Sequence, residues 1–317
     1  MSFLGGKPLQ LSIRLYTFVD SCIRTGVEKI LMAEKQHGSN AAAHTQVAII
    51  GSGFSGLGMA IRLGQEGRHD FRIFEKEDGV GGTWRVNHYP GCACDVQSHL
   101  YSFSFEPNPD WTRMFAPRDE IRAYLERCAD KYQVRPHIHL GTSLERAEWD
   151  EEAALWRLTD EHGNHYTTNI LVSGIGALSK PSYPPVSGLG RFQGKTFHSQ
   201  HWDHDYELKG RRVGVIGTGA SAIQFVPEVQ KVARHLTVFQ RSAPWIMPKP
   251  DRPIPRWKRA LFRRAPAAQI LRRKLLYWML EARAIPMIVK PKLLRMVKRA
   301  ALRHVRNQIG DPALRRK

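Results

Sequence analysis

The stretch Val47-Ala-Ile-Ile-Gly-Ser-Gly-Phe-Ser-Gly56 decides the fold, because a short apolar run leads directly into three closely spaced glycines. Val47–Ile50 predicts a buried strand, and the glycines predict a sharp turn into a helix. In such a unit Gly51 makes the turn, Gly53 lets a pyrophosphate approach the backbone, and Gly56 lets helix and strand pack closely. The first N–H groups of the helix then face the phosphates.

A second strand completes this first unit. The helix is expected to end near Glu66, and the apolar run Phe71–Phe74 is followed by Glu75. An acid about 20 residues after the turn is placed to hydrogen-bond a ribose 2′-OH. The residues predicted to bind this dinucleotide are Gly51, Ser52, Gly53, Phe54, Ser55, Gly56 and Glu75.

The same unit recurs later in the chain. Val213–Ile216 precedes Gly217-Thr-Gly-Ala-Ser-Ala222, a helix is expected to about Ala233, and Leu236–Phe239 predicts the next strand. That strand is followed by Gln240-Arg241-Ser242 rather than by an acid. An arginine cannot accept from a 2′-OH, but it can bind a 2′-phosphate in a bidentate manner. We therefore predict FAD at the first turn and NADPH at the second, although an exposed strand-end arginine is an alternative interpretation of Arg241. The residues predicted for NADPH are Gly217, Thr218, Gly219, Ala220, Ser221, Ala222, Arg241 and Ser242.

Between the two turns lies Phe192-Gln-Gly-Lys-Thr-Phe-His-Ser-Gln-His-Trp-Asp203. Gly194 permits a tight backbone course, and His198 and Trp202 are spaced to share one helical face. The pattern Phe192-x-Gly194-x-x-x-His198-x-x-x-Trp202-Asp203 resembles the signature of the Baeyer–Villiger monooxygenases, within the class B flavoprotein monooxygenases. The resemblance spans about residues 45–317.

The resemblance implies an enzyme that uses FAD and NADPH to insert one oxygen atom of O2 next to a ketone carbonyl, giving an ester or lactone through a C4a-peroxyflavin. Its partners would be O2 and a small ketone or related substrate. The residues implied in catalysis are Asp95, His198 and Trp202, with His198 and Trp202 coupling the two nucleotide domains.

In the family that the chain resembles, the segment matching Gly79–Tyr101 lies along the flavin. The FAD contacts implied in this way are Gly82, Thr83, Trp84, Asp95 and Tyr101, with Asp95 near the isoalloxazine. From the residues alone, an N-cap or turn aspartate is an equally good interpretation of Asp95.

Three alternatives stay open at this point. A flavin monooxygenase that oxygenates sulfur or nitrogen would share both glycine turns, and an NADPH:flavin reductase would need no oxygen transfer. The third is a truncated, non-catalytic fragment that binds dinucleotides. Only two strands are expected after Gly217, and no position matches the flavin-facing arginine of the family. Both domains are therefore expected to be incomplete at the C-terminal end, and we expect no ketone oxygenation from residues 1–317 alone.

These observations predict an α/β fold with two Rossmann-like dinucleotide-binding domains, for FAD and for NADP. The predicted divisions are an amphipathic helix and linker over 1–44, an FAD domain over 45–180, an NADP domain over 181–317, and a basic helical region over 256–317. Within the FAD domain, 118–132 predicts an amphipathic helix. The strands predicted for an antiparallel insertion are 138–140, 147–150, 155–159 and 165–169, before a separate return strand at 170–173.

The charge of the chain is concentrated at one end. Residues 256–317 hold 19 Lys and Arg against two acids, and so carry 17 of the 19 net positive charges. No nucleic-acid-binding module accompanies them, and solvated helices are preferred over a weak peripheral membrane contact. Cys92-x-Cys94 lacks a second ligand pair, so no metal site is predicted. Reduced thiols and the lack of a targeting signal favour a cytoplasmic protein.

Overall fold

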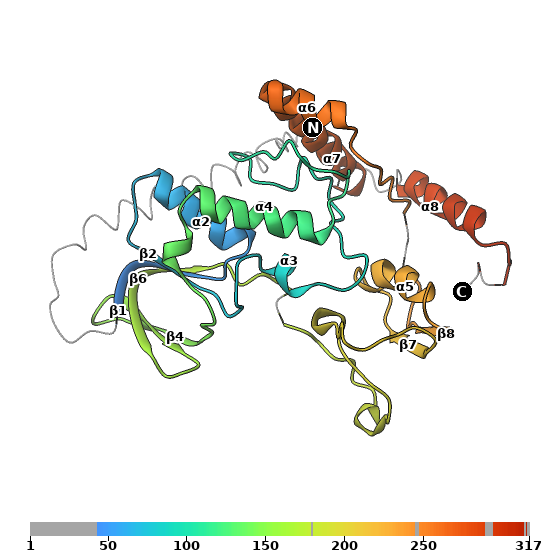
Figure 1. The fold of residues 1–317 in the computed structure, drawn as a ribbon, viewed down its shortest axis with the longest axis horizontal. Helices are drawn as coiled ribbons and strands as arrows, with labels where there is room; N and C mark the ends of the chain where they lie inside the picture. The colour runs from blue at the N-terminus through green and yellow to red at the C-terminus, as the bar shows by residue number, and fades with distance from the viewer. Residues whose placement is uncertain (1–42, 179, 245–246, 289–293, 314, 316–317) are drawn as a thin grey trace, which may run out of the picture. The chain divides into compact units, whose positions relative to one another are not determined.

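The structure is a computed structural model that describes residues 43–178, 180–244, 247–288, 294–313 and 315 (Figure 1). The amphipathic helix expected within residues 1–44 and most of the linker after it fall on the undescribed part, whereas Ala43 and His44, expected in the linker, begin β1. The strands are β1 Ala43–Ile50, β2 Phe71–Phe74, β3 Ile138–His139, β4 Leu144–Asp150, β5 Leu155–Asp160, β6 His165–Ser173, β7 Arg212–Ile216 and β8 His235–Phe239. The helices are α2 Phe54–Gln65, α3 Thr83–Val86, α4 Arg118–Lys131, α5 Ala222–Gln230, α6 Arg256–Arg264, α7 Pro266–Ile288 and α8 Leu294–Gln308.

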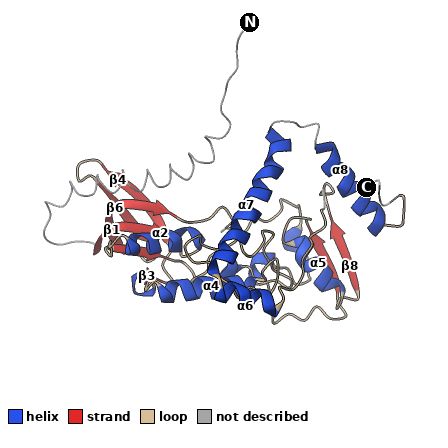
Figure 2. Ribbon diagram, turned by 90° about the horizontal axis from the view of Figure 1, so that it is seen from above, coloured by secondary structure: helices blue, strands red, loops and turns tan. Residues whose placement is uncertain are grey.

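The chain divides by its contacts into two units, one of residues 1–48 with 143–171 and one of residues 49–142 with 172–317. In the described residues, one sheet has the strand order β3-β2-β1-β6-β5-β4, and a second sheet pairs β7 with β8. The colours of Figure 2 separate these strands from the helices. The mixed α/β class predicted from the sequence is thereby confirmed, whereas the domain boundaries stay predictions.

The contact unit of residues 1–48 with 143–171 contains the antiparallel insertion. β4 pairs with β5 and β5 with β6, both antiparallel, with Trp149 opposite Trp156. These two rings meet edge to face at 5.7 Å, a cross-strand pairing that favours this register. The return strand expected at 170–173 is confirmed as the end of β6, which runs without a break from His165 to Ser173 and lies next to β1 in the sheet.

Residues 138–140 do not belong to the insertion. β3 pairs with β2 in parallel, with Ile73 opposite Ile138, and the Glu75 N–H donates to the carbonyl of His139 at 2.9 Å. A parallel neighbour needs a long crossover, which the segment containing α3 and α4 supplies. A run as short as Ile-His-Leu carries no signal of its partner, so its assignment to the antiparallel insertion was wrong.

Helix α4 carries the apolar face that its periodicity predicts. Ile121, Tyr124, Leu125 and Cys128 are all buried, and α4 contacts α2 and α3. The Tyr124 hydroxyl donates to the carbonyl of Glu106 at 2.7 Å and accepts from the N–H of Phe103 at 2.9 Å. These bonds satisfy a buried hydroxyl and attach the loop before α4 to the helix.

The second dinucleotide unit is a smaller copy of the first. β7 and β8 run parallel with Ile216 opposite Phe239, and α5 contacts β8. The helix ends at Gln230, three residues before the expected end near Ala233. Two parallel strands in the described residues agree with the expectation drawn from the sequence.

The basic C-terminal region is helical, as expected, and α6 packs against α7. His99, in the loop before α4, is buried where this pair docks, with its ring 4.9 Å from that of Phe262 and its Nδ1 3.4 Å from the amide nitrogen of Gln269. The same amide donates to the carbonyl of Asn108 at 2.6 Å. Burial lowers the pKa of His99 to about 4, and the nearby charges of Arg272 and Lys258 act in the same direction.

No helix in the part of the chain that the structure describes is both long enough and apolar enough to cross a membrane.

The buried His99 predicts acid sensitivity. The folded pKa of His99 lies below its unfolded pKa. The stability that depends on neutral His99 is therefore fully present above pH about 6.5, and it is lost as the pH falls toward about 4. In His99→Gln, the drop in unfolding free energy between pH 7 and pH 4.5 should shrink by about 2–3 kcal/mol. Urea denaturation at both pH values measures it. The control is His69→Gln at an exposed position, and an unchanged drop in His99→Gln would contradict the assignment.

Candidate dinucleotide-binding sites

The first glycine turn is held from several sides. The N–H of Gly51 donates to the carbonyl of Phe74 at 2.8 Å, and the N–H of Gly174 donates to the carbonyl of Ile50 at 2.9 Å. Gly51 has a φ of +91°, which favours glycine. A Cβ at Gly56 would lie 1.8 Å from the carbonyl oxygen of Gly51, so only glycine lets α2 begin this close to the strand.

The start of α2 is open to an anion. Gly53 occupies the N-cap without a side-chain hydrogen bond, and the first turn contains no acidic residue. The first N–H groups of the helix therefore lack an intrahelical partner and carry the positive end of the helix dipole. Phe54 begins the helix and Ser55 is exposed in its first turn. This arrangement fits a phosphate group.

Glu75 is buried at the end of β2 and is bound to the turn. One carboxylate oxygen accepts from both the N–H and the hydroxyl of Ser52, each at 2.7 Å, and the other accepts from the N–H of Glu77 at 3.0 Å. Ser52 is itself fully buried. A carboxylate has about four acceptor positions, so Glu75 keeps capacity for one further donor.

Four of the residues expected along the flavin lie close to this turn. Gly82 has a φ of +51°, and a Cβ there would lie 2.9 Å from the Cα of Gly53. Trp84 is buried, and its indole N–H donates to the hydroxyl of Tyr101 at 3.1 Å. Thr83 is exposed at the start of α3. The Tyr101 ring is 4.9 Å from that of Phe54, and burial raises the pKa of Tyr101.

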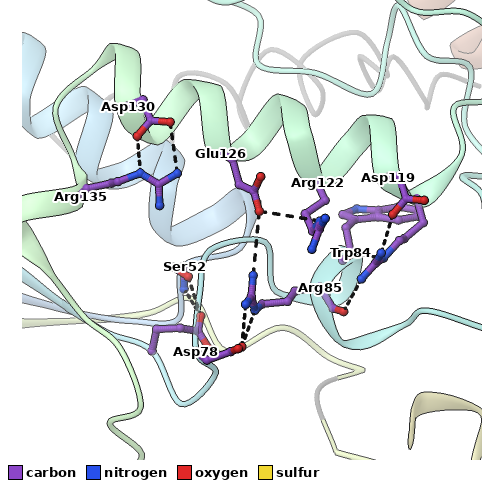
Figure 3. A network of polar contacts seen from close by, with 11 residues as sticks. Ser52, Asp78, Trp84, Arg85, Asp119, Arg122, Glu126, Asp130 and Arg135 are labelled. Carbon is purple, nitrogen blue, oxygen red and sulfur yellow. Dashed lines mark hydrogen bonds and ion pairs between the residues drawn. The ribbon is translucent and has the colours of Figure 1, made fainter. Parts of the chain in front are cut away.

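A polar network holds the short helix α3 in place (Figure 3). Arg118, at the start of α4, donates to the carbonyls of Trp84 at 2.9 Å and Arg85 at 3.1 Å. Arg85 pairs with Asp78 at 2.7 Å, and its guanidinium is 3.9 Å from Glu126. The position of Trp84 thus depends on two arginines that the sequence reasoning did not identify.

Asp95 lies in a bend rather than at a helix N-cap. One carboxylate oxygen is 3.2 Å from Lys249 Nζ and 3.4 Å from the amide nitrogen of Gln224. Sequence reasoning missed both partners. Gln224 follows the second turn by only two residues, but no local pattern announces a partner as distant along the chain as Asp95.

The second turn repeats the backbone geometry of the first. The N–H of Gly217 donates to the carbonyl of Phe239 at 2.9 Å, and Gly217 has a φ of +108°. Its surroundings differ, because apart from the adjoining residues in the chain, no described residue lies within 4 Å of a Cβ built at Gly217 or Gly219. Ser221 is the N-cap of α5, and its side chain makes no capping hydrogen bond. Thr218, Ala220 and Ala222 complete the turn, of which Ala222 is buried.

The residues that follow β2 and β8 differ between the two units, as the sequence comparison predicted. Because Phe74 and Phe239 receive equivalent bonds, Gln240 stands where Glu75 stands in the first unit, with Arg241 one residue beyond. Arg241 and Ser242 are both exposed. Their predicted contact with a 2′-phosphate stays a prediction.

The helical face expected for His198 and Trp202 is wrong. These residues flank a single 3-10 turn, Ser199–His201, and both have extended backbones. His198 Nδ1 accepts from the N–H of Gln200 at 3.1 Å, so the ring caps the turn instead of continuing a helix.

The rest of the connector is arranged by aromatic and charged contacts. Trp202 packs on Phe225 of α5 with ring centres 5.2 Å apart. Lys195 and Asp203 form an ion pair at 2.6 Å. Gly194 does not have a positive φ; instead a Cβ there would lie 2.4 Å from the ring of Phe192. The glycine is thus explained by the phenylalanine that packs on it.

The chain belongs to the flavin-binding monooxygenase-like family, whose model matches residues 44–293. It is 61% identical over 277 residues to a Baeyer-Villiger monooxygenase of Pseudomonas aeruginosa, across 87% of this chain and 53% of that protein. A Baeyer-Villiger monooxygenase of Streptomyces coelicolor is 50% identical over 274 residues, across 86% of this chain and 53% of that protein. The chain spans about half the length of the curated relatives it matches.

Two solved structures show the same fold. The closed crystal structure of cyclohexanone monooxygenase aligns with a TM-score of 0.67 and 34% identity, across 72% of this chain and 44% of that one. Oxidized steroid monooxygenase bound to NADP aligns with a TM-score of 0.67 and 38% identity, across 74% of this chain and 45% of that one.

Two glycines in α2 provide a matched test of the close approach. Gly56→Ala should lower the unfolding free energy by about 1–3 kcal/mol or more, because the added methyl meets the Gly51 carbonyl. Gly64→Ala has open space and should raise it by about 0.4–1 kcal/mol. Chemical denaturation of both variants measures the difference. Equal effects of the two substitutions would show that α2 does not rest on the turn.

Proposed function

We propose that this chain forms the two dinucleotide-binding units of an FAD- and NADPH-dependent monooxygenase, one that inserts an oxygen atom of O2 next to a ketone carbonyl. The family membership and the names of the two relatives support this reaction class. One observation carries the proposal. Two glycine turns share the same backbone bond to the following strand, but Glu75 follows one strand and Gln240-Arg241 follows the other.

FAD is assigned to the first turn. The backbone of Gly51–Gly56 would bind the pyrophosphate through the open helix start, and the remaining acceptor capacity of Glu75 suits a ribose hydroxyl. Gly82, Thr83, Trp84 and Tyr101 would line the same cofactor, and the buried Trp84 would exclude water from it. Bound FAD supplies the electron transfer and the oxygen chemistry, while the protein orients it.

NADPH is assigned to the second turn. The backbone of Gly217–Ala222 would bind its pyrophosphate, and Arg241 with Ser242 would bind its 2′-phosphate. The exposure of both side chains leaves them accessible to such a ligand.

The three residues proposed for catalysis have different tasks. Asp95 would face the flavin with its orientation set by Lys249 and Gln224. Trp202 packs on α5 and would transmit the position of the NADPH helix to the connector. His198 would hold the turn between them through its bond to Gln200.

The substrate class is taken from the solved relatives. The two solved structures above are a cyclohexanone monooxygenase and a steroid monooxygenase, so a cyclic ketone is the first substrate class to test. A cytoplasmic location is also proposed, on the reduced thiols described above.

A weak peripheral contact with an anionic membrane also stays a proposal. The basic segment carries exposed apolar side chains on α6 and α7, among them Trp257, Leu271, Leu275 and Trp278. Basic helices with such a face bind anionic lipid surfaces.

Arg241 provides the test of cofactor choice. Arg241→Ala should weaken NADPH binding by about 1.5–3 kcal/mol, the magnitude of a hydrogen bond to a charged group, because the 2′-phosphate loses its partner. NADH lacks that phosphate, so its affinity should change little. Titration with both nucleotides measures the two losses, and an equal loss for both would assign Arg241 a structural role.

The reaction class is tested with the chain alone and with the chain fused to the C-terminal half of the Pseudomonas aeruginosa relative. Both proteins should bind FAD, the chain alone more weakly because its domains are expected to be incomplete, and Gly53→Val should abolish binding by blocking approach to the backbone. With NADPH, O2 and cyclohexanone, the chain alone should yield H2O2 and the fusion the lactone. A fusion that oxygenates sulfides but no ketone would refute the proposed reaction. Absence of flavin from the parent chain would refute the cofactor assignment.

A further inference from the structure

The side chain of Gln224, in the first turn of α5, reaches the loop of residues 89–95 that ends at Asp95. Its amide oxygen accepts from the hydroxyl of Tyr89 and from the N–H of Ala93, each at 3.2 Å. Its amide nitrogen donates to the carbonyl of Ala93 at 2.9 Å and to the Asp95 carboxylate at 3.4 Å. One side chain thus binds three residues that lie about 130 positions away in the sequence.

These contacts use the full hydrogen-bonding capacity of the amide. A glutamine side chain has two N–H donors and an oxygen that accepts twice, and all four positions are occupied. If the amide were flipped, its N–H groups would face the N–H of Ala93 and its oxygen would face the Asp95 carboxylate. The contacts therefore fix both the orientation of the amide and the position of Ala93 beside the helix.

Backbone packing supports the same attachment. Gly91 has a φ of +78°, and a Cβ there would lie 2.7 Å from the carbonyl oxygen of Gln224. The ring of Tyr89 meets that of Phe225 edge to face at 5.9 Å. The loop therefore rests against the first two turns of α5 through its backbone as well as through side chains.

A second attachment reaches Asp95 from the other side. Lys249 Nζ donates to the carbonyl of Cys94 at 2.8 Å and lies 3.2 Å from the Asp95 carboxylate. More than half of the Asp95 side chain is exposed, so this ion pair alone is screened and weak. The hydrogen bonds between the Gln224 side-chain amide and the Ala93 backbone therefore set the position of the Asp95 backbone.

We infer that Gln224 is a positioning residue that couples occupancy of the second dinucleotide turn to the placement of Asp95 at the first. This rests on the proposed function. A ligand bound at the Gly217–Ala222 turn orders the start of α5, and Gln224 follows Ala222 by two residues. An ordered Gln224 holds Ala93 and Asp95 in place, so the two nucleotides stabilise each other. Such coupling is reciprocal.

The test uses two identical substitutions on one helix. Gln224→Glu keeps the side-chain size but sets a carboxylate against the Ala93 carbonyl and the Asp95 carboxylate. Gln230→Glu makes the same change at the exposed end of α5. The dissociation constant of NADP⁺ is measured for each 317-residue chain with and without saturating FAD.

In the parent chain and in Gln230→Glu, FAD should tighten NADP⁺ binding about 5-fold or more, the lower range of measured couplings. In Gln224→Glu this factor should fall to about 1 while each nucleotide still binds alone. Hydrogen exchange without ligand should be faster at the Ala93 amide in Gln224→Glu and in Gln224→Met, but not in Gln230→Glu. Gln224→Met keeps the volume of the side chain but not its hydrogen bonds, so it should also lose the coupling.

The outcomes separate the two proposals. A parent chain that binds both nucleotides without coupling would overturn this inference and leave the cofactor assignment intact. Retained coupling in Gln224→Glu would overturn it as well, and if that variant fails to fold, retained coupling in Gln224→Met would do the same. A parent chain that binds neither FAD nor NADP⁺ would overturn the proposed function together with the inference.

Discussion

The close approach of Gly56 to the carbonyl of Gly51 is the constraint on which the first unit depends. With no room for a methyl group, α2 must start where the strand ends, and its open N-terminus then points at the turn. The same approach places Ser52 against Glu75 and brings Gly53 beside Gly82. Phe54, which begins the helix, meets the rings of Tyr101 and Phe103 edge to face at 4.9 and 5.2 Å.

Local patterns predicted most of the regular structure. The two glycine turns, the strands beside them and the apolar face of α4 depend on residues within one turn or one strand, where spacing carries the information. The partner of β3 was missed because strand pairing is set by the whole sheet, and a two-residue strand has no pattern that names its neighbour. The helical face of His198 and Trp202 failed because a polar ring that caps a backbone N–H competes with helix formation.

The candidate site was also predicted only in part, because local patterns do not reveal contacts between residues far apart in the sequence. The residues of the turns could be recognised, but those that position them could not. Arg118 holds Trp84 through the carbonyl of Trp84, and Gln224 holds Asp95 through the backbone of Ala93. A side chain that binds a backbone group imposes no residue type on its partner, so the sequence contains no matching signal. Loops without regular structure take their position from such contacts with rigid elements.

The difference in packing around the two turns has a consequence for how long each would keep a ligand. Gly51 and Gly56 are enclosed by backbone atoms, whereas Gly217 and Gly219 face open space among the described residues. A molecule that enters the enclosed turn finds its contacts already ordered and loses little entropy to them, while one that enters the open turn must order its surroundings on arrival. The first turn is therefore suited to a ligand that exchanges slowly, and the second to a ligand that exchanges faster.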